Sequence, residues 1–227
     1  MNKRSVALFD FDKTIYSEYS IFSTTKYLIE LGYMDMSVEV RMLEEFAKYE
    51  TGMISYEEVG NRVLVIQAEG LRGVSFAVIR EKIIEFFNKN KNKFYPYFEK
   101  ILPRLKQGHD VVLVTASPQF VAEAIEEIFE LNGYLSTVYE VVEGVFTGKV
   151  EKTTISSKGE SIRSVLEKYG GETMAFGDSD SDVEMLSMVK VPVCINPIGS
   201  LKKTAEEKNW LITDGKNTEE KVFALLS

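Results

Sequence analysis

Short apolar runs alternate with helical patterns along most of the chain, and this alternation restricts the fold more than any other feature of the sequence. The apolar runs have the length of buried strands and span residues 5–9, 110–115, 173–177, 191–195 and 210–214. Segments with helical periodicity follow them at residues 119–131, 159–169, 181–188 and 218–226. Such alternation is typical of a sheet that is covered by helices on both faces. The sequence therefore predicts an α/β protein with a doubly wound, mostly parallel, Rossmann-like sheet.

Two stretches depart from this alternation. Residues 16–93 contain almost no strand-like run and several amphipathic segments, such as "STTKYLIELGY" and "VEVRMLEEFAKY". This stretch is too long for an ordinary connection between the first two strands. We therefore expect a helical cap at 16–93, inserted into an α/β core formed by 1–15 and 94–227. Residues 136–151 alternate apolar and polar residues around Gly144, which predicts a small β-hairpin.

Composition limits the partners and the location of the protein. The 227-residue chain has a net charge of −8, which argues against a nucleic-acid partner because phosphate backbones bind clustered lysine and arginine. No segment reaches the roughly 18 apolar residues that a membrane-spanning helix needs. The apolar run near the N-terminus stops at Asp10 and is too short for a secretory signal. The single cysteine suits a reducing compartment. We expect a cytoplasmic protein with no membrane partner.

Polar residues follow the predicted strands at the ends where doubly wound sheets bind ligands. They are Asp10 and Asp12 after the first strand, Thr115, Ala116 and Ser117 after the second, and Asp178, Asp180 and Asp182 after residues 173–177. Alternation along a strand places Asp10 and Asp12 on the same side. Clustered carboxylates repel one another unless a cation is present, and Mg²⁺ prefers carboxylate oxygen and water. The pattern predicts a Mg²⁺ site, with Lys158 as a further source of positive charge.

Four short motifs carry a resemblance to a known family. In order, "DFDKT", "VVLVTAS", "SSKGESI" and "FGDSDSD" resemble the four motifs of the haloacid dehalogenase-like hydrolases. The similarity is greatest to the subclass with a helical cap after the first motif, which includes phosphoserine phosphatases. "EVVEGVFTGKV" resembles the hairpin that this subclass carries between its second and third motifs. The resemblance spans nearly the whole predicted core and implies a phosphatase.

The resemblance implies a role for each matching residue. Asp10 would be the nucleophile that forms an aspartyl-phosphate. Asp12 would be the general acid that protonates the leaving oxygen and then the base that activates water. The carboxylates of Asp10 and Asp178 and the main-chain carbonyl of Asp12 would hold Mg²⁺.

Four further residues would support this chemistry if the resemblance holds. The Thr115 hydroxyl, the Ala116 N–H and the Lys158 ammonium would bind the phosphoryl oxygens. Asp182 would orient Lys158 and water on the metal. This division suits phosphoryl transfer, which needs positioning and charge neutralisation more than covalent help.

Other interpretations of the same residues remain open. Asp178 and Ser179 also suit the start of a helix, where aspartate and serine cap free amides. The triplet Asp-Lys-Thr resembles the nucleophile segment of ion-pumping ATPases, but this frame lacks the following Gly-Thr and leaves Asp10 without a role. A phosphotransferase would use the same aspartyl-phosphate. Receiver domains of signalling pathways combine similar residues, so a non-hydrolytic phospho-accepting or binding protein is a further alternative.

The substrate is expected to be a small phosphorylated metabolite, selected by the cap. Phosphoserine phosphatases carry a carboxylate nine residues after the nucleophile, where this chain has Tyr19, with Glu18 one place earlier. Glu18 is therefore a candidate for binding a substrate amine, and a solvated glutamate is the alternative. Arg62 is a candidate for binding a substrate carboxylate. Tyr16 and Phe22 are candidates for lining the substrate pocket, and residues of the cap core are the favoured interpretation. Phosphoserine and amino-alcohol phosphates are the candidate substrates, and no sequence feature assigns an oligomeric state.

Overall fold

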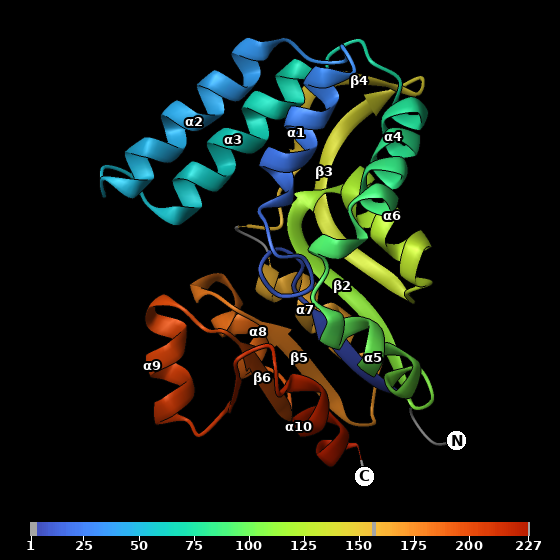
Figure 1. The fold of residues 1–227 in the computed structure, drawn as a ribbon, viewed down its shortest axis with the longest axis vertical. Helices are drawn as coiled ribbons and strands as arrows, with labels where there is room; N and C mark the ends of the chain where they lie inside the picture. The colour runs from blue at the N-terminus through green and yellow to red at the C-terminus, as the bar shows by residue number, and fades with distance from the viewer. Residues whose placement is uncertain (1–3, 156–157, 227) are drawn as a thin grey trace.

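A sheet of seven strands forms the centre of the computed structural model, which describes residues 4–155 and 158–226 (Figure 1). The strand order is β4-β3-β2-β1-β5-β6-β7. Neighbouring strands run parallel except for the antiparallel pair β3 and β4. The strands are β1 (Ser5–Phe9), β2 (His109–Pro118), β3 (Gly133–Val142), β4 (Val145–Lys152), β5 (Thr173–Gly177), β6 (Val191–Ile195) and β7 (Leu211–Thr213). The predicted mostly parallel α/β fold is confirmed.

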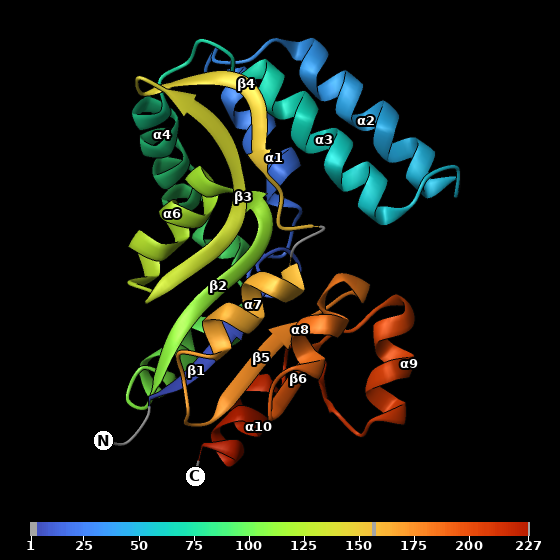
Figure 2. The same ribbon diagram turned by 180° about the vertical axis from the view of Figure 1, so that it is seen from behind.

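Helices cover both faces of this sheet (Figures 1 and 2). The helices are α1 (Ser20–Glu30), α2 (Met36–Glu50), α3 (Tyr56–Gly70), α4 (Phe76–Lys89), α5 (Pro96–Leu105), α6 (Gln119–Phe129), α7 (Lys158–Leu166), α8 (Val183–Ser187), α9 (Gly199–Glu207) and α10 (Thr218–Leu225). Two short 3-10 helices are η1 (Lys91–Lys93) and η2 (Asp180–Asp182). Within the described ranges, none of the helices combines the length and the apolar character that a membrane crossing requires.

The central strand β1 is apolar throughout because helices cover both of its faces. Ala7 and Phe9 point into the larger core cluster, to which α5, α6 and α10 contribute. Val6 and Leu8 point into the second cluster, to which α7, α8 and α9 contribute. The rings of Phe9 and Phe176 stack with centroids 4.0 Å apart, which joins the ends of β1 and β5. The residues that follow these two strands therefore begin at strand ends that are held together by this packing.

Residues 16–93 form helices α1 to α4, as expected. In Figure 1, α1, α2 and α3 lie at the top of the molecule and α4 lies beside α6. The loop between α3 and α4 pairs with the β3–β4 hairpin through main-chain bonds from Gly73 N to Phe146 O, from Phe146 N to Val74 O and from Phe76 N to Gly144 O (2.9–3.0 Å). The proposed division into a cap at 16–93 and a core at 1–15 and 94–227 stays a prediction.

The predicted hairpin is present and longer than expected. Its first strand, β3, pairs with β2 in parallel before it pairs with β4, so the hairpin extends the main sheet at its edge. The long curved strands β3 and β4 rise along α4 toward α3 (Figure 2). The hairpin thereby connects the sheet with the helices of residues 16–93.

A buried hydrogen-bond network joins the hairpin to α1, α3 and α6. The Tyr139 hydroxyl donates to Gln67 Oε1 (2.8 Å), and Gln67 Nε2 donates to Thr25 Oγ1 (2.8 Å). The Gln119 side chain bonds both main-chain groups of Tyr139, at 3.0 and 2.9 Å. All four residues are buried. Because unpaired buried polar groups are costly, this network favours one arrangement of these elements.

Candidate active site

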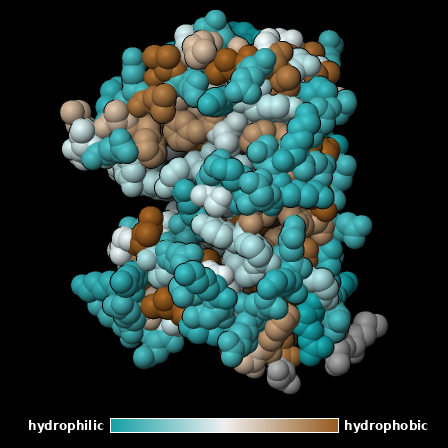
Figure 3. Space-filling view, viewed as in Figure 1, coloured by the Kyte–Doolittle hydropathy of each residue, from teal (hydrophilic) through white to brown (hydrophobic). Residues whose placement is uncertain are grey.

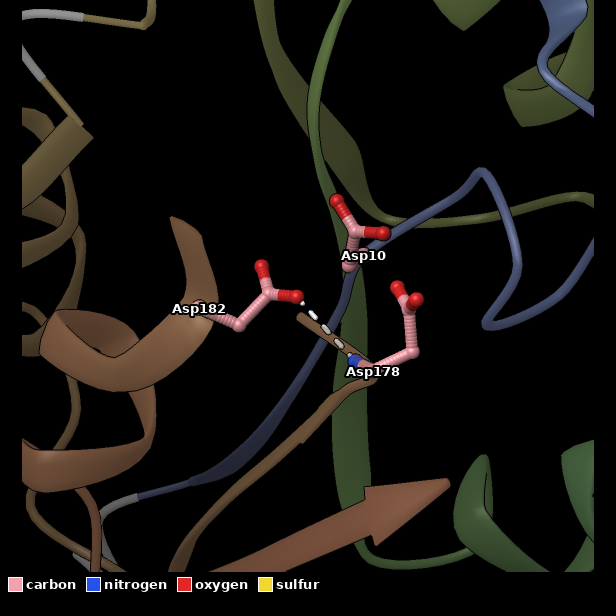
Figure 4. A group of neighbouring side chains, drawn as sticks. All are labelled: Asp10, Asp178 and Asp182. Carbon is pink, nitrogen blue, oxygen red and sulfur yellow. Dashed lines mark hydrogen bonds between the residues drawn. The ribbon is translucent and has the colours of Figure 1, made fainter. Parts of the chain in front are cut away.

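Three carboxylates meet at the carboxyl edge of the sheet (Figure 4). Asp10 follows β1 and Asp178 follows β5, and the Asp10 amide donates to the Phe176 carbonyl (2.9 Å), which holds the two strand ends together. Asp182 comes from η2, on the segment that follows Asp178. Each side chain offers one oxygen, and these oxygens all lie within 4.8 Å of one another.

This carboxylate cluster, made of Asp10, Asp178 and Asp182, is nearly closed to solvent. The exposed fractions of the three residues are 8%, 5% and 0%. Asp182 Oδ2 accepts the main-chain amides of Asp178 (3.1 Å) and Ser179 (3.2 Å), which fixes its direction. Three buried like charges at this spacing repel one another, and their hard oxygens are the ligands that Mg²⁺ prefers. The residues present therefore fit a magnesium ion.

Asp12 lies apart from the carboxylate cluster and faces helix α1. Its Oδ1 accepts the main-chain amide of Ser20 (2.9 Å), the first residue of α1, and its Oδ2 accepts the Ser117 hydroxyl (3.4 Å). The hydroxyls of Ser20 and Ser117 also bond each other (2.8 Å). A helix N-terminus stabilises a carboxylate through its free amides and its dipole. Asp10 and Asp12, two residues apart, thus have different surroundings.

Burial raises the pKa of Asp12 to about 6, although the Ser20 and Ser117 bonds and the charge of Lys13 lower it. Desolvation favours the protonated carboxyl because a charge is poorly stabilised away from water. A carboxyl with this pKa exchanges its proton near neutral pH. Such a group is suited to general acid–base work.

The end of β2 lies beside these acids. Thr115 is buried, and its Oγ1 accepts the Ser117 amide (3.0 Å) while its carbonyl accepts the Thr154 hydroxyl (2.7 Å). Thr115 and Ala116 line the same cavity as Asp10. Lys158 is the first residue of α7, and its side chain lies outside the part of the structure that is described.

A cavity of about 470 Å³ opens over the carboxylate cluster. Asp10, Asp12 and Asp178 lie on its lower side, and Tyr49 of α2 and Tyr56 of α3 lie on the opposite side. Figure 3 shows the corresponding hollow between the part of the molecule with α2 and α3 and the part with α8 and α9. A second cavity of about 70 Å³ shares Asp12, Tyr56 and Ala116 with the first and extends among the helices of residues 16–93.

The two candidate substrate residues lie outside both cavities. Glu18 is paired with Lys93, and both side chains are about two-fifths exposed. Arg62 pairs with Glu45 (2.7 Å) and Glu58 (3.7 Å) on the outer surface of α2 and α3. The structure thus does not bring Glu18 and Arg62 to the acids, and their predicted contact with a substrate has no support from this arrangement.

Three polar residues near the acids were not assigned a part in the chemistry from the sequence. Ser20 and Ser117 bond Asp12, and the Thr14 hydroxyl donates to Asp178 Oδ1 (3.3 Å). Ser117 and Thr14 belong to the motifs "VVLVTAS" and "DFDKT", so their place in the sequence could have indicated that they lie near the acids. Ser20 is separated from the first motif by a turn, and nothing in the sequence indicates that its amide returns to Asp12.

Curated relatives of this chain include proteins named as phosphatases. Phosphoserine phosphatase SerB1 of Mycobacterium tuberculosis is 37% identical over 115 residues, which cover 48% of this chain and 37% of that protein. Histidinol-phosphatase of Neisseria meningitidis is 24% identical over 94% of this chain and 100% of that protein. The match to SerB1 and the matches to two putative mycobacterial hydrolases cover less than two-fifths of those relatives.

Solved structures share the fold. A Bordetella pertussis protein of unknown function superposes with a TM-score of 0.75 at 23% identity, covering 94% of this chain and 100% of the other. A substrate-bound phosphoserine phosphatase superposes with a TM-score of 0.69 at 18% identity, covering 100% of both chains. The sequence profile described as haloacid dehalogenase-like hydrolase matches residues 7–187, which is most of the chain. The chain belongs to the haloacid dehalogenase-like hydrolase family.

Proposed function

We propose that the protein is a magnesium-dependent phosphatase that hydrolyses a small phosphomonoester through an aspartyl-phosphate on Asp10. The observation that carries this proposal is the separation of the two neighbouring aspartates. Asp10 belongs to the carboxylate cluster, whereas Asp12 is bonded to Ser20 and Ser117 outside it. A nucleophile and a proton carrier are thereby provided by one strand end.

In the first step, a carboxylate oxygen of Asp10 attacks phosphorus as the bond to the leaving oxygen breaks, and Asp12 gives its proton to that oxygen. In the second step, Asp12 takes a proton from a water molecule, which attacks phosphorus and releases phosphate and Asp10. Asp10, Asp178 and the Asp12 carbonyl would hold Mg²⁺, which when bound would supply the charge neutralisation that lets a carboxylate approach a phosphate dianion. The raised pKa of Asp12 supports its two roles.

Other residues would bind and orient the phosphoryl group. The Thr115 hydroxyl and the Ala116 amide are candidates because both residues line the cavity over Asp10. Lys158 is the candidate cation, as the family motif implies. Asp182 is held by the amides that follow β5 and is itself part of the carboxylate cluster, so we assign it to orienting this side of the site.

The names of the relatives support a small phosphorylated metabolite as the substrate, since a phosphoserine phosphatase and a histidinol-phosphatase are among them. Transfer of the phosphoryl group to another hydroxyl remains an alternative outcome of the second step. A cytoplasmic location stays a prediction.

Phosphate release from a panel of phosphomonoesters, with Mg²⁺ and with a chelator, tests this proposal. Asp10→Asn should abolish release, because an amide cannot serve as the nucleophile. Asp35→Asn is the matched control, because Asp35 lies outside both cavities and accepts the Ser37 amide through Oδ1 (2.9 Å), which asparagine can still do. A wild-type protein that holds phosphate on an aspartate for minutes with negligible turnover would instead support a phospho-accepting protein.

A further inference from the structure

The smaller cavity is an apolar recess formed by the helices above Asp12. Its walls are Ile21 and Phe22 of α1, Phe46 of α2, and Val59, Val63 and Leu64 of α3. The three α3 residues are buried, and the rings of Phe22 and Phe46 meet edge to face with centroids 5.3 Å apart. Three helices that follow one another along the sequence thus contribute apolar side chains to one small space.

The recess begins at the residue that would protonate the leaving oxygen. Asp12, Ala116 and Ser117 lie at its base, and Asp12 and Ala116 also line the larger cavity over the carboxylate cluster. A phosphoryl group bound next to Asp10 would therefore place its ester oxygen near Asp12. The organic group attached to that oxygen would then extend into the apolar recess.

The charge of the recess limits which organic group it accepts. Among the described residues that line it, Asp12 is the single charged one. Glu18 and Arg62, which could have bound an ammonium or a carboxylate group, are paired with Lys93 and with Glu45 outside it. A charged group without a partner in an apolar space is strongly disfavoured. A zwitterionic leaving group such as serine therefore has no matching partner in these walls.

We propose that the apolar recess receives an uncharged, apolar organic group, so that short alkyl or arylalkyl phosphates are the substrate class. This proposal rests on the phosphatase function proposed above. The volume of about 70 Å³ corresponds to about five water-sized groups, from the roughly 10–15 Å³ that one water needs. A chain of about four carbons or a single ring is of that size.

Turnover of a homologous substrate series tests the proposal. The series is ethyl, propyl and butyl phosphate with benzyl phosphate, compared with phosphoserine, all of which leave as alcohols that need a proton. We expect kcat/KM to rise about fourfold with each added methylene, as burial of a CH₂ group predicts, and phosphoserine to fall at least tenfold below butyl phosphate. A flat series, or a preference for phosphoserine, would overturn the proposal.

A pair of variants on α1 assigns the effect to the recess. Phe22→Ala removes a half-buried ring from its wall and should reduce the dependence on chain length at least threefold. Tyr27→Ala is the matched control, because Tyr27 is also half-buried on α1 but packs on Phe86 (5.2 Å) and lines neither cavity. Tyr27→Ala should keep the wild-type dependence of kcat/KM on chain length. If both variants lose the dependence on chain length equally, the effect does not come from the recess. If Phe22→Ala does not fold, the substrate series with the wild-type protein decides the proposal.

Binding measurements separate this proposal from the phosphatase function. Methyl- to butylphosphonate resist hydrolysis, and their affinity for the wild-type protein in Mg²⁺ can be measured by calorimetry. We expect the dissociation constant to fall about fourfold per methylene. If no phosphate ester is turned over but this trend appears, the recess proposal stands and the phosphatase proposal fails. If esters are turned over but the phosphonates show no trend, the recess proposal fails alone.

Discussion

The lower and upper walls of the active-site cavity differ in chemistry and in origin. The lower wall consists of carboxylates that follow β1 and β5. Asp10 and Asp178 come directly after the last residues of these strands, and Asp182 follows on η2. The upper wall, with the apolar recess that opens from it, consists mostly of aromatic and aliphatic side chains from α1, α2 and α3, together with Ser55 and Glu57. The lower wall is polar at a cost in stability, because it collects like charges. The upper wall is stabilised by its own packing, so the two walls should respond differently to substitution.

This difference also separates what the sequence predicts from what it does not. The acids, Thr115 and Ala116 stand in short contiguous motifs at strand ends, so their meeting follows from the sheet. The recess draws Phe22, Phe46 and Leu64 from three helices whose patterns are those of any amphipathic helix. Phe22 was therefore interpreted as a core residue in preference to a pocket residue, and the packing of α1 on α2 and α3 shows that it lines a cavity.

The fold likewise has parts that the sequence predicts and parts that it does not. The central strands β1, β5 and β6 match the predicted residues, because each is a short apolar run between turn residues. Two helices were not predicted. α5 contains Pro103 in its interior, where proline disfavours a helix, and α9 buries only Leu201 and Ala205. Their positions are decided by tertiary packing, which local patterns do not contain.

The largest effect should come from the lower wall, at the proton carrier. We expect Asp12→Asn to lower kcat for alkyl phosphates about a hundredfold or more, because the leaving alkoxide is no longer protonated. With p-nitrophenyl phosphate, whose leaving group needs no proton, rapid-mixing measurements should show a burst of p-nitrophenol followed by slow turnover, since release from Asp10 still needs a base. Equal losses with both substrates and no burst would contradict the role of Asp12.

The carboxylate cluster should couple stability to Mg²⁺. At a Mg²⁺ concentration of 100 times the dissociation constant, the free energy of unfolding should rise by about 2.7 kcal/mol. Asp178→Asn should remove most of this rise without lowering the stability of the metal-free protein, because it also removes one buried like charge. Thermal unfolding with Mg²⁺ and with a chelator measures both effects.

Asp180→Asn provides the control for this experiment. Asp180 is exposed and lies outside the carboxylate cluster, so the variant should keep the Mg²⁺ response. An unchanged response in Asp178→Asn, or a lost one in Asp180→Asn, would assign the cation to another place.

The stability of the helices that form the upper wall should depend on the buried hydrogen-bond network that joins α3 to the hairpin. Tyr139→Phe leaves Gln67 Oε1 without its donor and should lower the free energy of unfolding by about 1–2 kcal/mol. Tyr134→Phe is the control, because the half-buried Tyr134 hydroxyl donates to Glu123, which also pairs with Arg80. Chemical denaturation should show the smaller loss for Tyr134→Phe. A larger loss there would mean that the network does not fix the helices.

The smallest effect is expected at the surface pair of Glu18 and Lys93. Glu18→Gln should change the free energy of unfolding by less than about 1 kcal/mol, as exposed ion pairs do. It should change kcat/KM by less than about threefold for every substrate, measured across neutral and amine-bearing phosphates. A loss of kcat/KM confined to the amine-bearing esters would show that Glu18 contacts the substrate, and it would weaken the contrast between the two walls.

The bond between the Ser20 amide and Asp12 has a consequence for how the protein can move. The helix that supplies Phe22 to the apolar recess starts at the residue that holds the proton carrier. A tilt of α1 that widened the recess would therefore also stretch this bond. The fit of a substrate in the recess and the position of the acid are therefore coupled through the first residue of α1.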